Sequence, residues 1–299
     1  MALLMVNALL AVGTQRAWGR DLDEVRRNGV LRHLGIPYAY FVTGSGDGMD
    51  VELVQLFAAS LGVRYEFVKT SWNAAIADLT EKQRGNGNDA AQHSGGGEYR
   101  GDIIATGMTV LPWRERAVAF SEPLFPTQVW VIARADSPVR PIRPSGSLSR
   151  DIGRVKKLLR GRTLFCAPGS CLDPALYGIE ETGAVISIPK VGAPDELAPA
   201  IIKGEAEMSL LDVPDVLVAL QKWPGKIKVI GPISGVQEMS AAFRKESPLL
   251  RAAFNRFLEQ CRKDGTYDRL VRKYYPFAPG YFPEFFHGAG KKDSQGRAR

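Results

Sequence analysis

Apolar residues in the first part of the chain recur alternately with the periods of a strand and of a helix. An apolar run predicts a short strand at residues 30–35, and apolar residues at helical spacing predict a helix that Asp50 caps and Gly62 ends. Alternation at residues 63–67 predicts the next strand, and Ser71 can cap the helix that follows it. This order of elements is typical of α/β layers.

The rest of the chain repeats this alternation. Strands are predicted, in chain order, at residues 102–106, 128–133, 161–166, 185–188, 207–211, 227–230 and 239–243. A helical turn is predicted at Asp173-Pro174, and longer helices at residues 196–203, 214–222, 247–263 and 266–274. Two such runs predict a two-lobed α/β fold with mixed, mostly parallel sheets.

Two extended segments, near residues 126–133 and 239–243, are expected to cross between the lobes. Lobe one would then take residues 22–126 and 242–279, and lobe two would take residues 127–241. At about 100–200 residues per domain, a chain of 299 residues has room for two such lobes.

Two polar segments are expected to lie outside the packed lobes. Residues 81–100 are rich in glycine and asparagine and cannot bury enough apolar surface to become ordered on their own. We therefore expect them to be the most mobile surface loop of the mature chain. Residues 280–299 are expected to form a basic C-terminal tail.

The first residues predict an export signal. Residues 2–12 are apolar but too few to span a bilayer, and the small residues Ala17 and Gly19 precede a possible cleavage site before Arg20. No Lys or Arg precedes the apolar run, which is atypical of signals, and a buried first helix is the alternative. We favour a signal peptide over residues 1–19 and hence an exported protein.

Composition and charge exclude several classes of function. With 45% hydrophobic and 24% charged residues, the chain can bury a core without a disulfide or metal scaffold. The net charge is +7, but the basic residues are scattered, so no nucleic-acid partner is expected. The histidines stand apart from the cysteines, and no nucleotide-binding glycine motif or hydrolase nucleophile motif occurs. We therefore expect neither a metal nor a cofactor.

Two small groups of residues could carry chemistry. Cys166, Cys171 and Cys261 match no zinc or redox spacing, and in an oxidising compartment we expect at most one disulfide, involving Cys166 or Cys171. These two can pair locally across a turn, or Cys261 can reach one of them. Asp212 and Asp215 are three residues apart at a helix start and could form an acid–base pair. We favour ordinary acidic residues at a helix N-terminus.

One stretch of the chain is more specific. Residues 101–125, GDIIATGMTVLPWRERAVAFSEPLF, resemble the signature of the family 3 extracellular solute-binding proteins. That signature is an apolar strand, small and hydroxyl residues, an Arg, and then aromatic-Ser-Asp/Glu-Pro. Other pieces agree with the family pattern in the same order: Gly48-Met49-Asp50-Val51-Glu52-Leu53, Lys69-Thr70-Ser71-Trp72, Lys203-Gly204-Glu205-Ala206-Glu207 up to Asp212, and Asp264-Gly265-Thr266-Tyr267. The resemblance covers about residues 22–276 and implies a type II periplasmic-binding fold with two crossing strands at its hinge.

The resemblance also implies a binding site. In family members that bind amino acids, an Arg grips the α-carboxylate with help from the preceding turn, and a late Asp holds the α-ammonium. A residue of the second lobe adds a donor, and an aromatic side chain stacks on the ligand. Arg114 matches the carboxylate-binding Arg, with Thr106, Gly107 and Thr109 in the preceding turn, and Asp212 matches the late Asp. Ser170 or Cys171 matches the second-lobe donor. Trp72, with Tyr38 or Tyr40, matches the stacking aromatic residue. Because an Arg fork fits a carboxylate and an Asp complements an ammonium, we expect Arg114 and Asp212 to face each other across a cleft.

By resemblance, the protein is expected to be a monomeric periplasmic receptor. It would close on a small molecule, an amino acid or a related zwitterion, and deliver it to the membrane permease of an ABC transporter. Two features depart from the family pattern. Cys171 stands where a hydroxyl residue is common, and residues 81–100 exceed the usual connection in length.

Three alternative functions follow from the same resemblance. The chain resembles the solute-binding half of lytic transglycosylase F, but only about twenty residues follow the last predicted helix, so we expect no lysozyme-like catalytic domain. A dehydratase on this fold would need a titratable acid in the cleft, which a raised carboxylate pKa would reveal. A periplasmic accessory protein of an oxidoreductase system would have a stable periplasmic partner.

Overall fold

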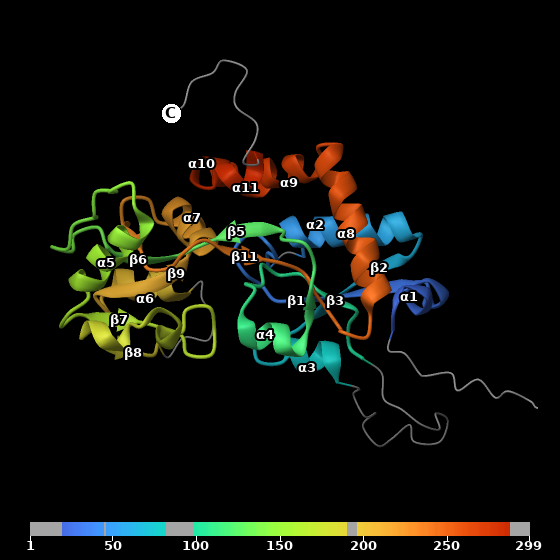
Figure 1. Cartoon of the computed structure of the whole chain (residues 1–299), viewed down its shortest axis with the longest axis horizontal. Helices are drawn as coiled ribbons and strands as arrows, with labels where there is room; N and C mark the ends of the chain where they lie inside the picture. The colour runs from blue at the N-terminus through green and yellow to red at the C-terminus, as the bar shows by residue number, and fades with distance from the viewer. Residues whose placement is uncertain (1–19, 45, 82–98, 190–195, 288–299) are drawn as a thin grey trace, which may run out of the picture.

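The strands form two five-stranded sheets, one in each of the two lobes in Figure 1. The computed structural model describes residues 20–44, 46–81, 99–189 and 196–287. The mixed α/β sheets and the two lobes confirm the predicted fold class. The expected signal peptide and nearly all of the expected loop at residues 81–100 lie outside the described residues.

The first sheet combines strands from distant parts of the chain. Its order is β2–β1–β3–β12–β4, and these strands span, respectively, Arg64–Lys69, Val30–Gly35, Ile103–Ile104, Ala242–Phe243 and Ala119–Phe120. β1 pairs in parallel with β2 and β3, whereas β12 pairs antiparallel with β3 and β4. The chain therefore leaves this lobe after β4 and returns to it at β12.

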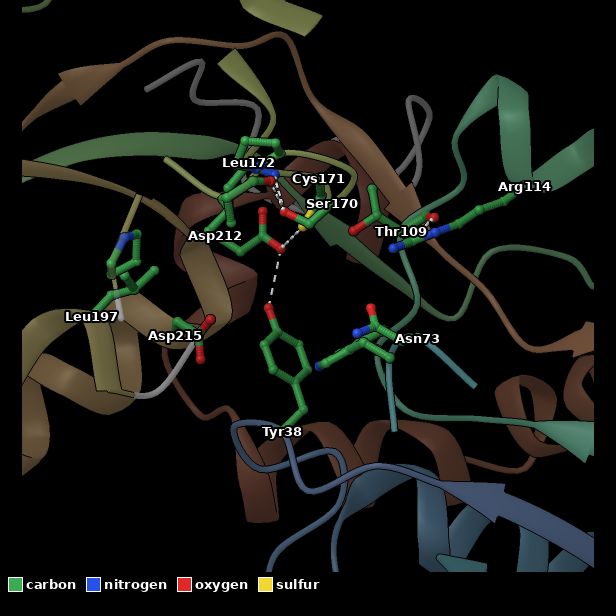
Figure 2. Close-up of a pocket in the computed structure, with 15 residues that line it drawn as sticks. Tyr38, Asn73, Thr109, Arg114, Ser170, Cys171, Leu172, Leu197, Asp212 and Asp215 are labelled. Carbon is green, nitrogen blue, oxygen red and sulfur yellow. Dashed lines mark hydrogen bonds between the residues drawn. The ribbon is translucent and has the colours of Figure 1, made fainter. Parts of the chain in front are cut away.

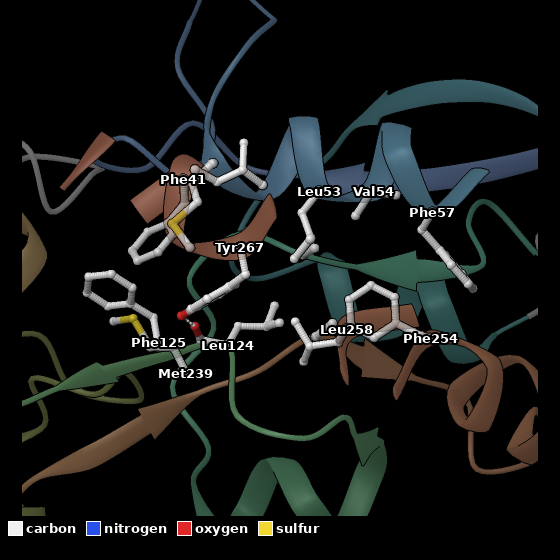
Figure 3. Packing of buried hydrophobic residues seen from close by; sticks show 14 of the residues in the cluster. Phe41, Leu53, Val54, Phe57, Leu124, Phe125, Met239, Phe254, Leu258 and Tyr267 are labelled. Atoms are coloured by element: carbon white, nitrogen blue, oxygen red, sulfur yellow. Dashed lines mark hydrogen bonds between the residues drawn. The ribbon is translucent and has the colours of Figure 1, made fainter. Parts of the chain in front are cut away.

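Helices cover the first sheet and enclose the main core of this lobe. α1 (Leu22–Asn28), α2 (Met49–Leu61) and α8 (Pro248–Lys263) contact strands of this sheet, and α9 (Thr266–Tyr274) packs on α2 and α8. In Figure 3, Leu53 and Phe57 of α2 lie near Phe254 and Leu258 of α8, and all four side chains are buried. The Phe57 and Phe254 rings meet edge to face at 5.1 Å between centroids. Helix α3 (Ala75–Thr80) packs near β1 and β3.

The second sheet has the order β10–β6–β9–β7–β8. These strands span, respectively, Ile227–Pro232, Val129–Arg134, Met208–Asp212, Thr163–Phe165 and Val185–Ser187. The helices of this lobe are α5 (Leu148–Leu158), α6 (Leu197–Lys203) and α7 (Val213–Lys222), with short 3-10 turns at Pro174–Tyr177 and Glu180–Thr182. β7 and β9 run parallel. The loop after β7 and the last residue of β9 therefore meet at one edge of the sheet.

Two short strands connect the lobes. β5 (Phe125–Thr127) pairs antiparallel with β11 (Gln237–Met239), and the side chains of Phe125 and Met239 are buried. The single strand predicted at residues 239–243 is therefore two strands in two sheets. β11 ends the crossing at Met239, and β12 begins in the first sheet at Ala242.

Two predicted helix caps are wrong. α2 begins at Met49, so Asp50 lies inside its first turn and accepts a hydrogen bond from the Gly107 backbone nitrogen at 2.7 Å. Ser71 does not cap α3, which begins at Ala75 with no side-chain cap. A polar residue near a helix start resembles a cap in sequence, and a tertiary partner such as Gly107 is not visible there.

The C-terminal region contains helices that the sequence did not predict. α10 (Ala278–Tyr281) and α11 (Pro283–His287) extend into the segment expected as a tail from residue 280. Phe286 packs against Phe125 of β5, with ring centroids 5.7 Å apart. Aromatic residues thus hold this segment against the core. No helix among the described residues is long and apolar enough to cross a bilayer.

Candidate functional site

A cavity of about 210 Å³ lies between the two lobes. The first lobe contributes Tyr38, Trp72, Asn73, Gly107, Thr109 and Arg114 to its wall. The second lobe contributes Ala167, Pro168, Ser170, Cys171, Leu172, Pro189, Leu197, Asp212 and Asp215 (Figure 2). Many of these residues follow strands β3, β7 and β9, and the carboxyl ends of strands are where open α/β sheets bind ligands.

Arg114 supplies the positive charge of the cavity. It lies on α4 (Pro112–Ala117), a helix whose first residue is the proline favoured at that position. The Arg114 residue is only 5% exposed, and its Nη1 donates to the backbone oxygen of Thr109 at 2.8 Å. Its guanidinium carbon lies 5.7 Å from the Trp72 ring centroid, close enough for a cation–π contact. Its Nε has no hydrogen-bond partner among the described residues.

Asp212 supplies a negative charge from the opposite lobe. It is the last residue of β9 and immediately precedes α7, and it is 1% exposed. Its Oδ2 accepts hydrogen bonds from the Tyr38 hydroxyl and from the Cys171 thiol, each at 3.1 Å (Figure 2). Its Oδ1 is buried and has no partner in the described part of the chain. Both charged groups thus keep an atom that can bind a ligand.

Burial dominates the electrostatics of this cavity. Burial raises the pKa of Asp212, and hydrogen bonds from Cys171 and Tyr38 and the charge of Arg114 oppose that rise only in part. Burial also raises the pKa of Cys171, followed by the effect of Asp212, so this group is a neutral thiol that can donate. For Arg114, burial lowers the pKa. A ligand that carries complementary charges would relieve the cost of burying these ions.

Two hydrogen bonds connect the lobes beside the cavity. One joins Tyr38 to Asp212, and the other joins the Tyr40 hydroxyl to Gln221 Oε1 of α7 at 3.1 Å. Trp72 meets Tyr38 edge to face at 5.5 Å between ring centroids. Tyr38 and Tyr40 of the first lobe are therefore bonded to β9 and α7 of the second lobe.

Several residues predicted for the site have other roles. Tyr40 and Thr106 do not line the cavity, and the Thr106 hydroxyl bridges the backbone of Ile36 by donating to its oxygen and accepting from its nitrogen. Gly107 lines the cavity, but its N–H is engaged by Asp50.

Ser170 also lines the cavity, yet its side chain stabilises its own turn. Its hydroxyl donates to the Ala167 oxygen at 2.6 Å and accepts from the Leu172 nitrogen at 3.0 Å. Of the two candidates for the second-lobe donor, Cys171 is the one whose side chain contacts Asp212.

The predicted disulfide is not present, and all three cysteines are free. Cys166 is buried in the core of the second lobe, and Cys261 is buried on α8 in the first. Cys171 instead points toward Asp212 in the cavity (Figure 2). The three thiols thus occupy three different environments.

Sequence reasoning missed part of the cavity wall. Asn73 directly follows the predicted Trp72, and Asp215 lies one helical turn beyond Asp212. The structure places both Asp212 and Asp215 in the cavity, although Asp215 was interpreted as an ordinary helix-start acid. The apolar wall residues Leu172 and Leu197 gave no signal, because apolar residues near strand ends usually indicate a core. Among the described residues, no group of three or more His, Cys, Asp or Glu side chains could hold a metal ion.

Sequence and structure comparisons agree with this architecture. The chain matches the model of "Bacterial extracellular solute-binding proteins, family 3" over residues 32–85 and 96–277. The lysine/arginine/ornithine-binding periplasmic protein of Escherichia coli is 23% identical over 92% of this chain and 97% of its own length. Membrane-bound lytic murein transglycosylase F of Desulfosudis oleivorans is 25% identical over 92% of this chain. This chain spans only 56% of the length of that transglycosylase.

Solved structures share the fold. A mutant of the arginine-binding protein ArgBP from T. maritima superposes with a TM-score of 0.66 at 23% identity, covering 85% of this chain and 99% of that one. An ancestral amino acid-binding protein described as a precursor of cyclohexadienyl dehydratase has a TM-score of 0.63 at 24% identity, covering 85% and 98%. These likenesses establish the two-lobed type II periplasmic-binding fold.

Proposed function

The chain belongs to the family 3 bacterial extracellular solute-binding proteins, and we propose that it is a receptor that closes on an amino acid or a similar small zwitterion. The observation that carries the proposal is the pair of unused atoms on opposite walls of the cavity. Arg114 Nε is an unpartnered donor on the first lobe, and Asp212 Oδ1 is an unpartnered acceptor on the second, within the described residues.

These two atoms suit the two ends of an α-amino acid. The Arg114 guanidinium can donate to an α-carboxylate, and Asp212 can accept from an α-ammonium. Both bonds are charge-assisted and are shielded from water, because Arg114 is 5% and Asp212 is 1% exposed. A neutral sugar would leave both buried charges without a counter-charge, which is costly.

Lobe closure follows from the same arrangement. A ligand that touches Arg114 and Asp212 makes contacts in the closed state that an open state lacks, so it shifts the population toward closure. In this proposal the Tyr38–Asp212 hydrogen bond adds to the closed state. We propose that the receptor is exported to the periplasm and acts as a monomer. In its closed, ligand-bound state it delivers the ligand to the permease of an ABC transporter.

The first experiment is a thermal-shift screen with amino acids, amines, sugars and organic acids, because a ligand that binds only the native state raises the melting temperature. Calorimetry with the best ligand then compares the parent with Arg114→Ala and Asp212→Ala. Removing either charge leaves the opposite ligand charge unpaired, at a cost of about 3–5 kcal/mol, which corresponds to a loss of roughly a hundredfold or more in affinity.

Arg116→Ala is the matched control for Arg114→Ala. Arg116 lies on the same helix, and its side chain is exposed, so its removal should change affinity by less than about twofold. If Arg114→Ala and Asp212→Ala both bind within a few-fold of the parent, the amino-acid clamp is wrong, and a neutral or anionic solute becomes the better candidate.

A second candidate function is a dehydratase-like lyase, and one observation favours it. Burial raises the pKa of Asp212, and a buried carboxyl with a raised pKa is the kind of group that serves as a general acid. Proton NMR of the bound amino acid after long incubation separates the two functions. A receptor returns its ligand unchanged, whereas an eliminating enzyme produces a new olefinic signal that disappears in Asp212→Asn.

A further inference from the structure

The net positive charge of the chain is concentrated in one segment. Residues 137–162 contain eight basic residues and one acidic residue, so this segment alone carries the net charge of +7, and the remaining residues have no formal net charge. The expectation that the basic residues are scattered is therefore wrong. The segment contains α5 of the second lobe and the chain that leads into it.

Helix α5 places its basic residues on one face. Arg150, Arg154 and Lys157 are spaced four and three residues apart, which puts them on the same side of the helix, and all three are exposed. Val155 is buried in the core of the second lobe, and α5 packs against β10. The helix therefore rests on the sheet with its apolar side and turns its basic side to solvent.

The chain before α5 adds to this face. The Ile142 nitrogen donates to the Ile230 oxygen of β10 at 2.9 Å, which holds this chain beside the sheet. Arg154 Nη1 donates to the Arg143 oxygen at 3.2 Å, so the exposed Arg143 lies next to α5. We call these four exposed residues the basic surface: Arg143, Arg150, Arg154 and Lys157.

The one acidic residue of the segment does not neutralise the basic surface. Asp151 is 7% exposed, and its two carboxylate oxygens accept from the Ser145 nitrogen at 3.1 and 3.0 Å. It lies 3.6 Å from Arg154 Nη1, which gives that residue a counter-charge. The other three residues of the basic surface form no salt bridge among the described residues. Most of this charge is thus available to an anionic partner.

The basic surface is separate from the ligand cavity. In Figure 1, α5 lies in the second lobe on the side away from the first lobe. None of the residues of the basic surface lines the cavity between the lobes. A partner bound to α5 therefore leaves the cavity accessible to a ligand.

The composition of the segment favours a membrane over a macromolecule as the partner. Residues 137–162 contain no Phe, Tyr or Trp. Protein interfaces are centred on aromatic anchors, and single-stranded nucleic acids stack their bases on aromatic rings. Anionic phospholipid headgroups require only positive charge held near the bilayer surface.

We propose that the basic surface holds the protein on an anionic phospholipid bilayer through the phosphate groups of the lipids. The second lobe then faces the membrane with α5, while the cavity stays free to bind its ligand. This interaction goes beyond the proposed receptor function and does not depend on the identity of the ligand.

The first test is co-sedimentation of the full chain with lipid vesicles. Vesicles of equal parts phosphatidylglycerol and phosphatidylcholine should bind the protein at least roughly tenfold more tightly than vesicles of phosphatidylcholine alone. Binding should weaken with added salt, because the Debye length decreases from about 10 Å at 0.1 M to about 3 Å at 1 M. Equal binding to both kinds of vesicle would overturn the proposal.

The second test removes three charges of the basic surface together, with Arg143→Gln, Arg150→Gln and Lys157→Gln. Each charge near an anionic bilayer contributes about fivefold in affinity, so the triple variant should bind the anionic vesicles roughly a hundredfold more weakly. These substitutions leave the contacts of the Arg154 side chain in place. The variant should keep the melting temperature of the parent.

A second triple variant is the matched control, with Arg256→Gln, Lys263→Gln and Arg272→Gln. It removes the same charge at exposed positions of α8 and α9 in the first lobe, and it should change vesicle binding less than about threefold. The apolar residues 2–12 are common to all variants, so the comparison isolates the basic surface. Equal losses in both triple variants would show that net charge alone drives binding and would refute the proposal.

Competition identifies the partner. Polyglutamate or a DNA duplex, added at the same concentration of negative charge as the vesicles, should leave most of the protein on the lipid. If either removes it, an acidic protein or a nucleic acid is the partner, and the membrane proposal is wrong. If anionic vesicles do not bind the parent while an amino acid still raises its melting temperature, this inference fails and the proposed function stands.

Discussion

Two clusters of buried Arg and Asp residues in this protein are built in opposite ways. In the first lobe, Asp102 is fully buried and accepts from Arg20 Nε at 2.8 Å, from the Arg32 backbone nitrogen at 2.9 Å and from Arg244 Nη2 at 3.4 Å. Arg244 donates further to the backbone oxygens of Gly101 and Arg20. Among the described residues, only Nε of Arg244 in this cluster has no partner.

The cavity cluster leaves much more unsatisfied. Within the described residues, Arg114 makes one side-chain hydrogen bond, to a backbone oxygen, and the carboxylate of Asp212 accepts from two neutral groups, Tyr38 and Cys171. The two opposite charges lie on different lobes. The comparison teaches that burial alone does not identify a binding residue. What distinguishes the site is a buried charge whose partners inside the chain are incomplete.

The largest expected effect is the loss of stability when the cluster around Asp102 loses its carboxylate. Asp102→Ala leaves Arg20 and Arg244 buried without their carboxylate, which should lower the free energy of unfolding by about 3–5 kcal/mol. Urea denaturation measures this change. Asp136→Ala is the control, because the Arg134–Asp136 pair is exposed and should contribute less than about 1 kcal/mol. Equal losses for the two variants would contradict the distinction between the clusters.

The next effect concerns the cavity cluster of Arg114 and Asp212, where a substitution should weaken ligand binding without lowering stability. Arg114→Met removes a buried charge that has one protein hydrogen bond, so the free energy of unfolding without ligand should change by less than about 1 kcal/mol. Ligand affinity should nevertheless fall roughly a hundredfold or more. Calorimetry and urea denaturation on one preparation check both values. A loss of stability as large as that of Asp102→Ala would show that Arg114 is primarily structural.

Asp50 is intermediate between the two clusters, because only one of its two carboxylate oxygens has a partner among the described groups. It should make the stability of the protein depend on pH. One of its oxygens accepts from Gly107, the other has no partner among the described groups, and burial raises its pKa from 3.8 to about 7. The native state therefore binds this proton more tightly than the unfolded state. The contribution of Asp50 to stability is complete below about pH 4 and decreases as the pH rises toward 7.

Asp50→Asn should remove this contribution, which amounts to a slope of at most about 1.4 kcal/mol per pH unit. Urea denaturation between pH 4 and 8 measures the slope in the parent, in Asp50→Asn and in the exposed control Glu205→Gln. Tyr267 and Tyr275 face Asp50 and stay neutral over this range, because burial raises the pKa of each. Burial also raises the pKa of Asp212, so Asp212 adds a pH dependence of stability with the same sign. Asp50→Asn should therefore retain part of the parent's slope. Identical slopes in the parent and in Asp50→Asn would contradict this assignment.

The sequence was a good guide where the structure depends on local periodicity. The β1 prediction matches Val30–Gly35, and Gly204 ends α6 with a left-handed φ of 83°, as the pattern indicated. β4 was missed because two residues carry no period. The predicted cap at Asp50 was wrong because its partner, Gly107, is distant in sequence.

The site could be predicted only as far as the family pattern reaches. The pattern pointed to Arg114 and Asp212, and the structure places both in one cavity. It also pointed to Thr106, whose hydroxyl the chain uses for its own backbone at Ile36. The contact of Cys171 with Asp212 depends on how a loop and a strand end meet, which no spacing in the sequence reveals. The spacing did pair Asp215 with Asp212, but an acidic residue in the first turn of a helix is so common that the sequence favoured the ordinary interpretation.

The smallest expected effect concerns Cys171, the departure from the family pattern. Its thiol is a weak donor to Asp212 Oδ2, and burial raises its pKa, so it stays protonated at neutral pH. Cys171→Ser replaces it with a stronger donor of similar size and should change ligand affinity by less than about threefold. Cys171→Ala removes the donor and should weaken binding by about 1 kcal/mol, or roughly fivefold. Calorimetry distinguishes the two, because only the alanine variant leaves Asp212 with Tyr38 as its one donor among the described residues. If Cys171→Ser weakens binding as much as Cys171→Ala, hydrogen bonding is not what Cys171 contributes, and its volume or its sulfur contact with the ligand must account for its place in the cavity.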